Sequence, residues 1–194
     1  MEAEFYVNMQ SELEKSFKND VDWNMIFYIP VKSKKHKYKA KIEALNSKIT
    51  VQYYNDTALD SYGTLDKVIL SQKLGMPRPH NVLIPSLMIG IWSGYKTINL
   101  YGADHSWLPL IKVLDNNVAV LSHNHFYDKD RQEHKPMTKK GVGQRNLHEM
   151  LQKFYLTFKG YHAIEKLARR KNIRIINCTK NSFIDAFERN QQNG

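Results

Sequence analysis

Residues 94–107 read GYKTINLYGADHSW, and this stretch does most to decide the fold. A helix-like run ends at Gly94, and residues 97–101 (TINLY) predict a strand. The residues GADHSW at positions 102–107 follow at the carboxyl end of that strand, which is where ligands bind in open α/β sheets. A small residue, an acid, an imidazole, a hydroxyl and an indole side by side at this place predict a site rather than a core.

Outward from this stretch, apolar runs predict further strands, and apolar side chains spaced by three and four residues predict helices. The predicted strands are residues 23–30, 48–54, 97–101, 118–121 and 173–178, and the predicted helices are residues 4–17, 34–45, 65–74, 82–93, 145–171 and 181–189. Such alternation is typical of a parallel sheet. We therefore expect one α/β domain over residues 1–194, with a mostly parallel sheet of about five strands and helices on both faces.

The composition is that of an ordinary globular domain. The chain has 194 residues, of which 42% are hydrophobic and 25% charged, enough for one domain with a core of its own. The longest apolar run, residues 82–92, contains Pro85 and is too short to span a bilayer. The polar, acidic amino terminus lacks the pattern of a signal peptide, and the single cysteine, Cys178, excludes a disulfide framework. These features predict a cytoplasmic protein.

The charge of the chain suits an anionic partner. The formal net charge is +10 at pH 7, which favours nucleic acid, membrane headgroups or a phosphorylated substrate. The basic residues are scattered and no nucleic-acid-binding motif accompanies them, so we do not expect a nucleic-acid partner. Peripheral association with a membrane stays open, and the sequence does not indicate an oligomeric state.

Three groups of polar residues are candidates for chemistry. The first is Asp104, His105, Ser106 and Trp107, after the central strand. Asp104 could cap a helix, and the group could equally contact a ligand. The two roles are compatible, because a helix N-terminus at the end of a strand suits a phosphate.

The second group is the run HNHFYD at residues 123–128. Strand alternation would place His123 and His125 on one side, where they could bind a metal together with Asp128 or Asp104. Contact of His125 or Tyr127 with a substrate is a further alternative, and an ordinary polar strand end is the third.

The third group is His80 and Asn81, which precede the buried helix. Asn81 is the natural N-cap there and is equally a candidate ligand contact. The basic loop at residues 139–145 could fold over an anion. The sequence contains neither a phosphate-binding Walker pattern nor a dinucleotide fingerprint, and no serine lies in a nucleophile elbow.

Several of these segments resemble known families. The order of a buried helix, GYKTINLYGAD and an aromatic-rich polar stretch resembles the small bacterial sialyltransferases and the related MptE-like (hydroxymethylpterin diphosphokinase-like) proteins. A later long helix, a strand like IRIINCT and the Asn181-Ser182 pair extend the resemblance over roughly residues 23–187. The resemblance implies a Rossmann-like protein that uses a nucleotide-sugar donor and a glycan acceptor in surface-polysaccharide synthesis.

The resemblance also implies roles for particular residues. Asn81, Asp104, His105 and Ser106 would approach the donor phosphate, and Trp107 or Tyr127 would stand in for tyrosines of the family. The position of the family's histidine base falls near Tyr155, so His125, His148 or His162 would have to replace it. Both families begin with a Gly-Asn-Gly-Pro-Ser-Leu-like loop that has no counterpart here. The chain is therefore expected to be the C-terminal portion of such a protein or a relative without the donor half.

Three functional hypotheses follow. The first is a glycosyltransferase with His125 and Asp104 as catalytic residues and with His80, Asn81, His105, Ser106, Trp107 and Tyr127 in contact with substrate. The second is an MptE-like pyrophosphate-transfer enzyme, which would need Mg²⁺ held by carboxylates such as Asp104 and Asp128. The third is a non-catalytic module that binds a nucleotide or sugar. The sequence predicts no resident cofactor for the first or the third.

Overall fold

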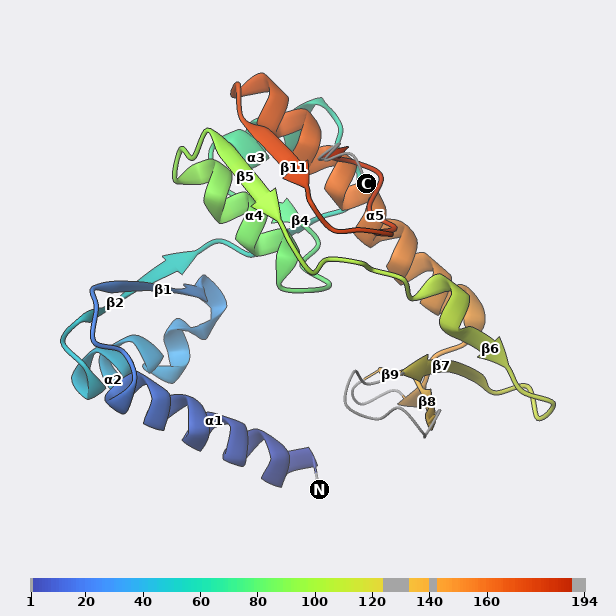
Figure 1. Ribbon diagram of the computed structural model, residues 1–194, viewed down its shortest axis with the longest axis horizontal. Coiled ribbons are helices and arrows are strands. Elements are labelled where there is room, and N and C mark those ends of the chain that lie inside the picture. The colour runs from blue at the N-terminus through green and yellow to red at the C-terminus, as the bar shows by residue number, and fades with distance from the viewer. Residues whose placement is uncertain (1, 124–132, 140–142, 190–194) are drawn as a thin grey trace.

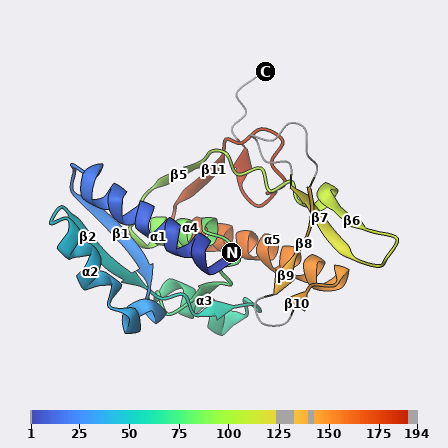
Figure 2. The ribbon, with the colours of Figure 1, turned by 90° about the horizontal axis from the view of Figure 1, so that it is seen from below.

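The computed structural model of the chain describes residues 2–123, 133–139 and 143–189. Buried apolar side chains form three clusters, one near the N-terminus, a large central one and a small one beside an antiparallel sheet. Figure 1 and Figure 2 both show the blue N-terminal segment at one end of the molecule and the antiparallel sheet at the other. The central cluster lies between these two ends.

The N-terminal unit is a helix followed by a β–α–β arrangement. Its elements are α1 (Glu2–Asn19), β1 (Met25–Pro30), the 3-10 helix η1 (Val31–His36), α2 (Tyr38–Leu45) and β2 (Ile49–Tyr54). Strands β1 and β2 pair in parallel, with Met25 opposite Ile49. Phe17, Ile42 and Val51 are buried together, so that both helices help to bury this two-stranded sheet.

The central unit contains the longest helices and a second parallel sheet. Its elements are β3 (Ala58–Leu59), α3 (Thr64–Ser71), β4 (Met76–Pro77), α4 (Leu83–Trp92), β5 (Thr97–Leu100), α5 (Leu147–Arg170), β11 (Arg174–Asn177) and β12 (Glu188–Arg189). Strand β11 lies between β5 and β12 and is parallel to both. Ile84 and Met88 of α4 and Ile164 of α5 are fully buried, so the apolar stripes of the two helices form the main core.

Helix α5 continues without interruption through Gly160, a residue type at which helices can bend or break. A methyl group at this position would lie 3.1 Å from Cβ of Pro77 and 3.6 Å from Cδ1 of Ile84. The glycine therefore allows α5 to approach β4 and α4 closely, and it does not interrupt the helix. This contact fixes the helix against the segment that leads to His80.

The third unit is an antiparallel sheet at the beginning of α5. It comprises the 3-10 helix η2 (Leu108–Leu110), β6 (Ile111–Val113), β7 (Ala119–His123) and β8 (Glu133–Pro136), with the small pair β9 (Thr138–Lys139) and β10 (Gly143–Gln144) beside it. Strand β7 pairs with β6 and β8, antiparallel to both. Leu121 of β7 is buried with Met150 and Phe154 of α5, which joins the sheet to the helix.

The predicted Rossmann-like sheet of about five mostly parallel strands, with helices on both its faces, is wrong. The described residues form five separate sheets of two or three strands, and two of these sheets are antiparallel. Strand 118–121 turns back on β6 because Asn117 adopts a left-handed conformation (φ 63°) in the tight turn before it, as asparagine tolerates. In β4 the N–H groups of Met76 and Arg78 both donate to the β3 side, and Pro77 between them has no N–H to donate to a further strand on the other side.

The predicted helix at residues 181–189 is also wrong. Asn181 is left-handed (φ 54°), and the buried Ser182 hydroxyl donates to the carbonyl oxygen of Ala103 at 2.6 Å. The N–H of Phe183 donates to the carbonyl oxygen of Asp104 at 2.7 Å. These tertiary hydrogen bonds replace the helical ones and tie the segment to the loop after β5.

The remaining predicted elements are confirmed in type, with ends that differ by a few residues. The segment at residues 34–45 is divided, because Lys37 adopts a left-handed conformation (φ 54°) between η1 and α2. Within the described ranges, no helix combines the length and the apolar content that crossing a bilayer requires.

Candidate functional site

A pocket of about 250 Å³ lies where the loop before α4 meets the first half of α5. The segment after β5 and the antiparallel sheet form its other walls. The side chains that line it come from all of these elements and are His80, Asn81, Trp107, Leu121, Met137, Lys153, Phe154 and Thr157. The pocket therefore gathers residues from two of the three polar groups that the sequence singled out.

Asn81 occupies a fixed position at the beginning of α4. Its Oδ1 accepts the backbone N–H of Ile84 at 3.2 Å, as an N-cap side chain does. Its Nδ2 therefore faces the other way and donates to the Tyr161 hydroxyl at 2.9 Å. The same Nδ2 lies 3.4 Å from Nε2 of His105. Asn81 is thus both a cap and part of a side-chain network.

The network favours one tautomer of His105. The Tyr161 oxygen accepts a hydrogen from Asn81 and lies 2.6 Å from Nε2 of His105. Nδ2 of Asn81, which only donates, lies 3.4 Å from the same Nε2. An accepting Nε2 suits both neighbours, because the Tyr161 hydroxyl can donate its proton to it. A neutral imidazole with an accepting Nε2 carries its proton on Nδ1, so we expect the N–H donor of His105 at Nδ1.

Burial keeps this network uncharged. Burial lowers the pKa of His105, and the nearby charge of Asp104 opposes that shift only in part. Burial likewise raises the pKa of the Tyr161 hydroxyl well above its usual range. At neutral pH the imidazole is neutral and the phenol keeps its proton, which is the state that the hydrogen bonds require.

Aromatic rings form one wall of the pocket. The Trp107 ring stacks on Phe154 with a centroid distance of 5.4 Å and an interplanar angle of 19°. The His105 ring lies 4.2 Å from Trp107. His105 has a left-handed backbone (φ 53°), which is uncommon for a residue other than glycine and is enriched at functional sites. This conformation allows the rings of His105 and Trp107 to face the same region.

The polar side of the pocket is cationic. Nε2 of His80 is buried and has no hydrogen-bond partner in the described structure. Lys153 is half-buried, and burial together with the charge of Arg145 lowers its pKa. No carboxylate side chain is among the described residues that line the pocket. A buried polar atom without a partner calls for a ligand or a water, and a pocket with this charge favours an anion.

The two half-buried imidazoles predict that the chain is less stable in mild acid. Burial lowers the pKa of both His80 and His105 in the folded chain, whereas an unfolded histidine has a pKa of about 6.5. Below about pH 6.5 the unfolded chain binds more protons, so the free energy of unfolding should fall as the pH drops. Urea unfolding at about pH 7.5 and about pH 5.5 measures this fall. The double variant His80→Gln/His105→Asn should lose most of it, and an equally steep fall in that variant would contradict the prediction.

The structure brings four of the predicted substrate contacts together. His80, Asn81 and Trp107 line the pocket, and His105 contacts both Asn81 and Trp107. Asp104 is exposed and does not line it. The hydroxyl of Ser106 donates to the Asp104 carboxylate, and this hydrogen bond lowers the pKa of Asp104. The pair forms a local turn beside the pocket.

The second predicted group cannot be placed in the same way. His125, Tyr127 and Asp128 lie outside the described residues. His148 is exposed, and exposed His162 lies 3.1 Å from the Asp185 carboxylate. The described part of the chain contains no group of three or more His, Cys, Asp or Glu side chains that could hold a metal ion.

Two central residues of the pocket region were not predicted from the sequence. Tyr161 matches the apolar spacing of the long helix, which does not distinguish it from a core residue. Lys153 follows the same spacing, three residues after buried Met150 and four before buried Thr157. A lysine on the buried side of a helix is unusual, and this signal could have identified it.

No protein-family model, curated protein sequence or solved structure matches this chain. The resemblance to sialyltransferases and MptE-like proteins therefore depends on the quoted sequence segments alone. It stays a prediction, and the geometry of the pocket is the independent observation that bears on function.

Proposed function

We propose that the pocket binds the phosphate-bearing part of a nucleotide-sugar and that the chain serves glycosyl transfer in surface-polysaccharide synthesis. The observation that carries the proposal is the buried, unpartnered Nε2 of His80 beside half-buried Lys153 in a pocket without a described carboxylate. An ammonium and an imidazole N–H are suitable partners for phosphate oxygens. The resemblance of residues 94–107 to sialyltransferases gives the same ligand class.

The aromatic wall of the pocket suits the half of such a ligand that carries the planar base. Trp107 is half-buried and held in its plane by the stack on Phe154. A planar base can stack on an indole that is already ordered, and less conformational entropy is then lost on binding. Phosphate contacts on one side and an aromatic face on the other are what a nucleotide requires.

In glycosyl transfer the leaving phosphate gains negative charge as the sugar departs. Lys153 would stabilise that charge from a half-buried position, where electrostatic effects are stronger than in bulk water. His105 would donate from Nδ1, and Tyr161 and Asn81 would hold its ring in place. The base that accepts the proton of the acceptor hydroxyl is assigned to His125 from the sequence.

Removing the charge of Lys153 should weaken nucleotide binding. A hydrogen bond to a charged group contributes about 1.5–3 kcal/mol, so Lys153→Gln should raise the Kd by about tenfold to a hundredfold. Isothermal titration with CMP, CDP, UDP and GDP and their sugars, with and without Mg²⁺, measures this change. Lys166→Gln, an exposed lysine on the same helix, is the matched control and should bind like the parent chain.

The outcomes separate the hypotheses. Binding of one nucleotide that Lys153→Gln weakens and Lys166→Gln does not would support the proposal and name the donor. If Lys153→Gln and Lys166→Gln bind the nucleotide with the same Kd, the nucleotide binds at another place. Binding that depends strictly on Mg²⁺ would favour pyrophosphate transfer instead. No binding across the whole set would overturn the proposed function for this chain.

A further inference from the structure

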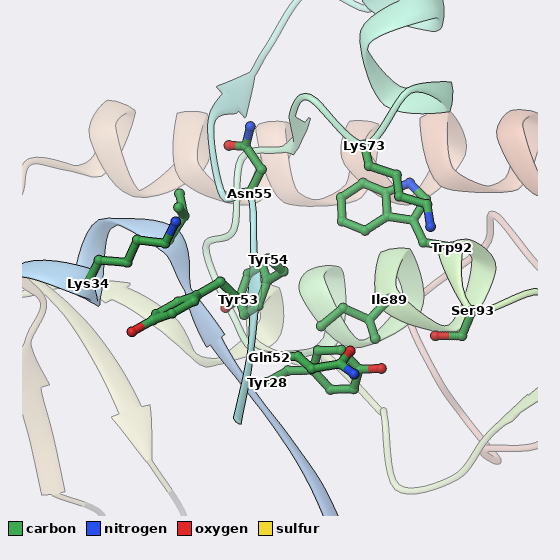
Figure 3. A pocket seen from close by; sticks show the side chains of 11 residues that line it. Tyr28, Lys34, Gln52, Tyr53, Tyr54, Asn55, Lys73, Ile89, Trp92 and Ser93 are labelled. Carbon is green, nitrogen blue, oxygen red and sulfur yellow. The ribbon is translucent and has the colours of Figure 1, made fainter. Parts of the chain in front are cut away.

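A second pocket, of about 390 Å³, lies at the carboxyl ends of the parallel strands β1 and β2. Its walls come from segments far apart in the sequence, as Figure 3 shows. Tyr28, Tyr53 and Tyr54 belong to the strands, Trp92 to the last turn of α4, and Lys73 to the turn after α3. The size is within the usual range of ligand pockets, roughly 300–1,000 Å³.

This pocket offers aromatic faces together with free polar groups. In the described structure, the hydroxyls of Tyr28, Tyr53 and Tyr54 and the amide of Gln52 make no hydrogen bond to the protein. Trp92 is ordered, because its Nε1 donates to the carbonyl oxygen of Leu70 at 3.0 Å. Ring faces attract weakly positive C–H groups, and hydroxyls and amides both donate and accept hydrogen bonds. A sugar ring presents both kinds of group.

The charge of the pocket comes from two lysines. Lys34 and Lys73 line it on opposite sides (Figure 3), and no carboxylate is among its described lining residues. Nζ of Lys34 lies 5.1 Å from the centre of the Tyr53 ring, and neither lysine has an ion pair among the described residues. Nearby Lys32, by contrast, is paired with Asp56. The two unpaired cations give the pocket a preference for an anionic ligand.

The pocket continues into a longer groove between β1 and α4. A neighbouring cavity of about 630 Å³ shares Tyr28, Tyr54 and other lining residues with it. This cavity adds Trp23 and Tyr95, whose side chains are 55% and 64% exposed. A ligand that uses both cavities would be elongated and would meet several aromatic rings in succession.

We propose that this groove binds an acidic oligosaccharide, with sugar rings against the aromatic side chains and a negative group between Lys34 and Lys73. The groove is separate from the candidate functional site. The two share no lining residue, although the groove reaches Val82, next to Asn81. The end of the groove that carries Trp92 lies at the far end of α4, which spans ten residues, or about 15 Å. The groove therefore gives the chain a second ligand, independent of the proposed nucleotide.

Nuclear magnetic resonance of the full chain tests this proposal through its tryptophan indole signals. The probe is a hyaluronan tetrasaccharide, which carries carboxylates, and chitotetraose is the neutral control. We expect the acidic tetrasaccharide to shift the Trp92 signal saturably, with a Kd lower than that of chitotetraose by about tenfold. Lys34→Gln and Lys73→Gln should each weaken binding severalfold. Lys35→Gln, an exposed neighbour outside the lining, should not.

Four results would overturn the proposal, three of them with the parent chain. They are equal affinity for the neutral and the acidic tetrasaccharide, saturable binding that leaves Trp92 unshifted, and no binding at all. Parent-like affinity of both lining-lysine variants would do the same. A nucleotide is expected to shift Trp107 and not Trp92, so failure of the oligosaccharide proposal and failure of the proposed nucleotide site are read from different signals.

Discussion

Replacing Tyr161 with phenylalanine is expected to lower the free energy of unfolding by about 1–3 kcal/mol, the usual effect of leaving buried polar groups without a partner. The variant keeps the buried ring and removes only the hydroxyl. Two polar atoms then lose a hydrogen-bond partner. They are Nδ2 of Asn81 and Nε2 of His105, which lie 2.9 Å and 2.6 Å from the Tyr161 hydroxyl. Urea unfolding at neutral pH measures the change.

Tyr155→Phe is the matched control for this variant. Tyr155 lies on the same helix, and its side chain is 60% exposed, so loss of its hydroxyl should change stability by less than about 0.5 kcal/mol. Equal stabilities for the two variants would show that the Tyr161 hydroxyl contributes nothing to the fold.

A second measurement on Tyr161→Phe separates a general loss of packing from loss of the network. With Tyr161 present, we expect Nε2 of His105 to accept a hydrogen bond and Nδ1 to carry the ring proton. Without the hydroxyl that restraint is gone, and the ring proton should distribute between both nitrogens. Nitrogen-15 chemical shifts of the imidazole report the tautomer. An unchanged tautomer would contradict the role assigned to Tyr161.

Gly160→Val is expected to destabilise the chain by about 3 kcal/mol, at the upper end of what overpacking of a core usually costs. The first carbon of the new side chain would lie 3.1 Å from Cβ of Pro77. Pro77 is buried and its ring is rigid, so it cannot rotate away. Helix α5 would have to move away from β4, and the pocket beside His80 would be distorted with it. Chemical unfolding again gives the magnitude.

Gln152→Val controls for the poor helix propensity of valine. Gln152 is exposed on the same helix, so its substitution should destabilise by well under about 1 kcal/mol. Gly160→Ala should fall between the two, since better helix propensity offsets part of the tighter contact. A Gly160→Val variant as stable as Gln152→Val would mean that α5 and β4 are not closely packed.

Local patterns predicted the elements better than they predicted how the strands pair. The spacing of apolar residues in α5 is long and regular, and the ends of α4 carry Asn81 and Gly94 as boundary signals, so both helices were predicted. Strand pairing depends on contacts distant in the sequence. The strand predicted at residues 118–121 forms at residues 119–123, but the left-handed Asn117 turns it back on β6. No parallel neighbour was therefore available to it.

The candidate site was predictable to the extent that it lies at the end of a strand. His105 and Trp107 follow β5 directly, and Asn81 precedes a helix, so residue type and position indicated them. Tyr161 lies within α5, where helical spacing makes it look like any other member of a buried face, whereas Lys153 stands out there only as a lysine on that face. Their role comes from which side chains meet across the fold, and a single sequence does not encode that juxtaposition locally.

The division of the buried side chains into three clusters affects how the chain unfolds. The N-terminal cluster is built within residues 17–53, so its contacts are local and it can open without the rest, as cooperative units known as foldons do. Unfolding is then not obliged to be a single two-state event. The chain has three tryptophans, and each belongs to a different unit: Trp23 precedes β1, Trp92 packs on the central cluster, and Trp107 packs on the cluster beside the antiparallel sheet. The molecule thus carries one tryptophan in each of its three units, so that separate opening of the N-terminal unit can be followed at Trp23.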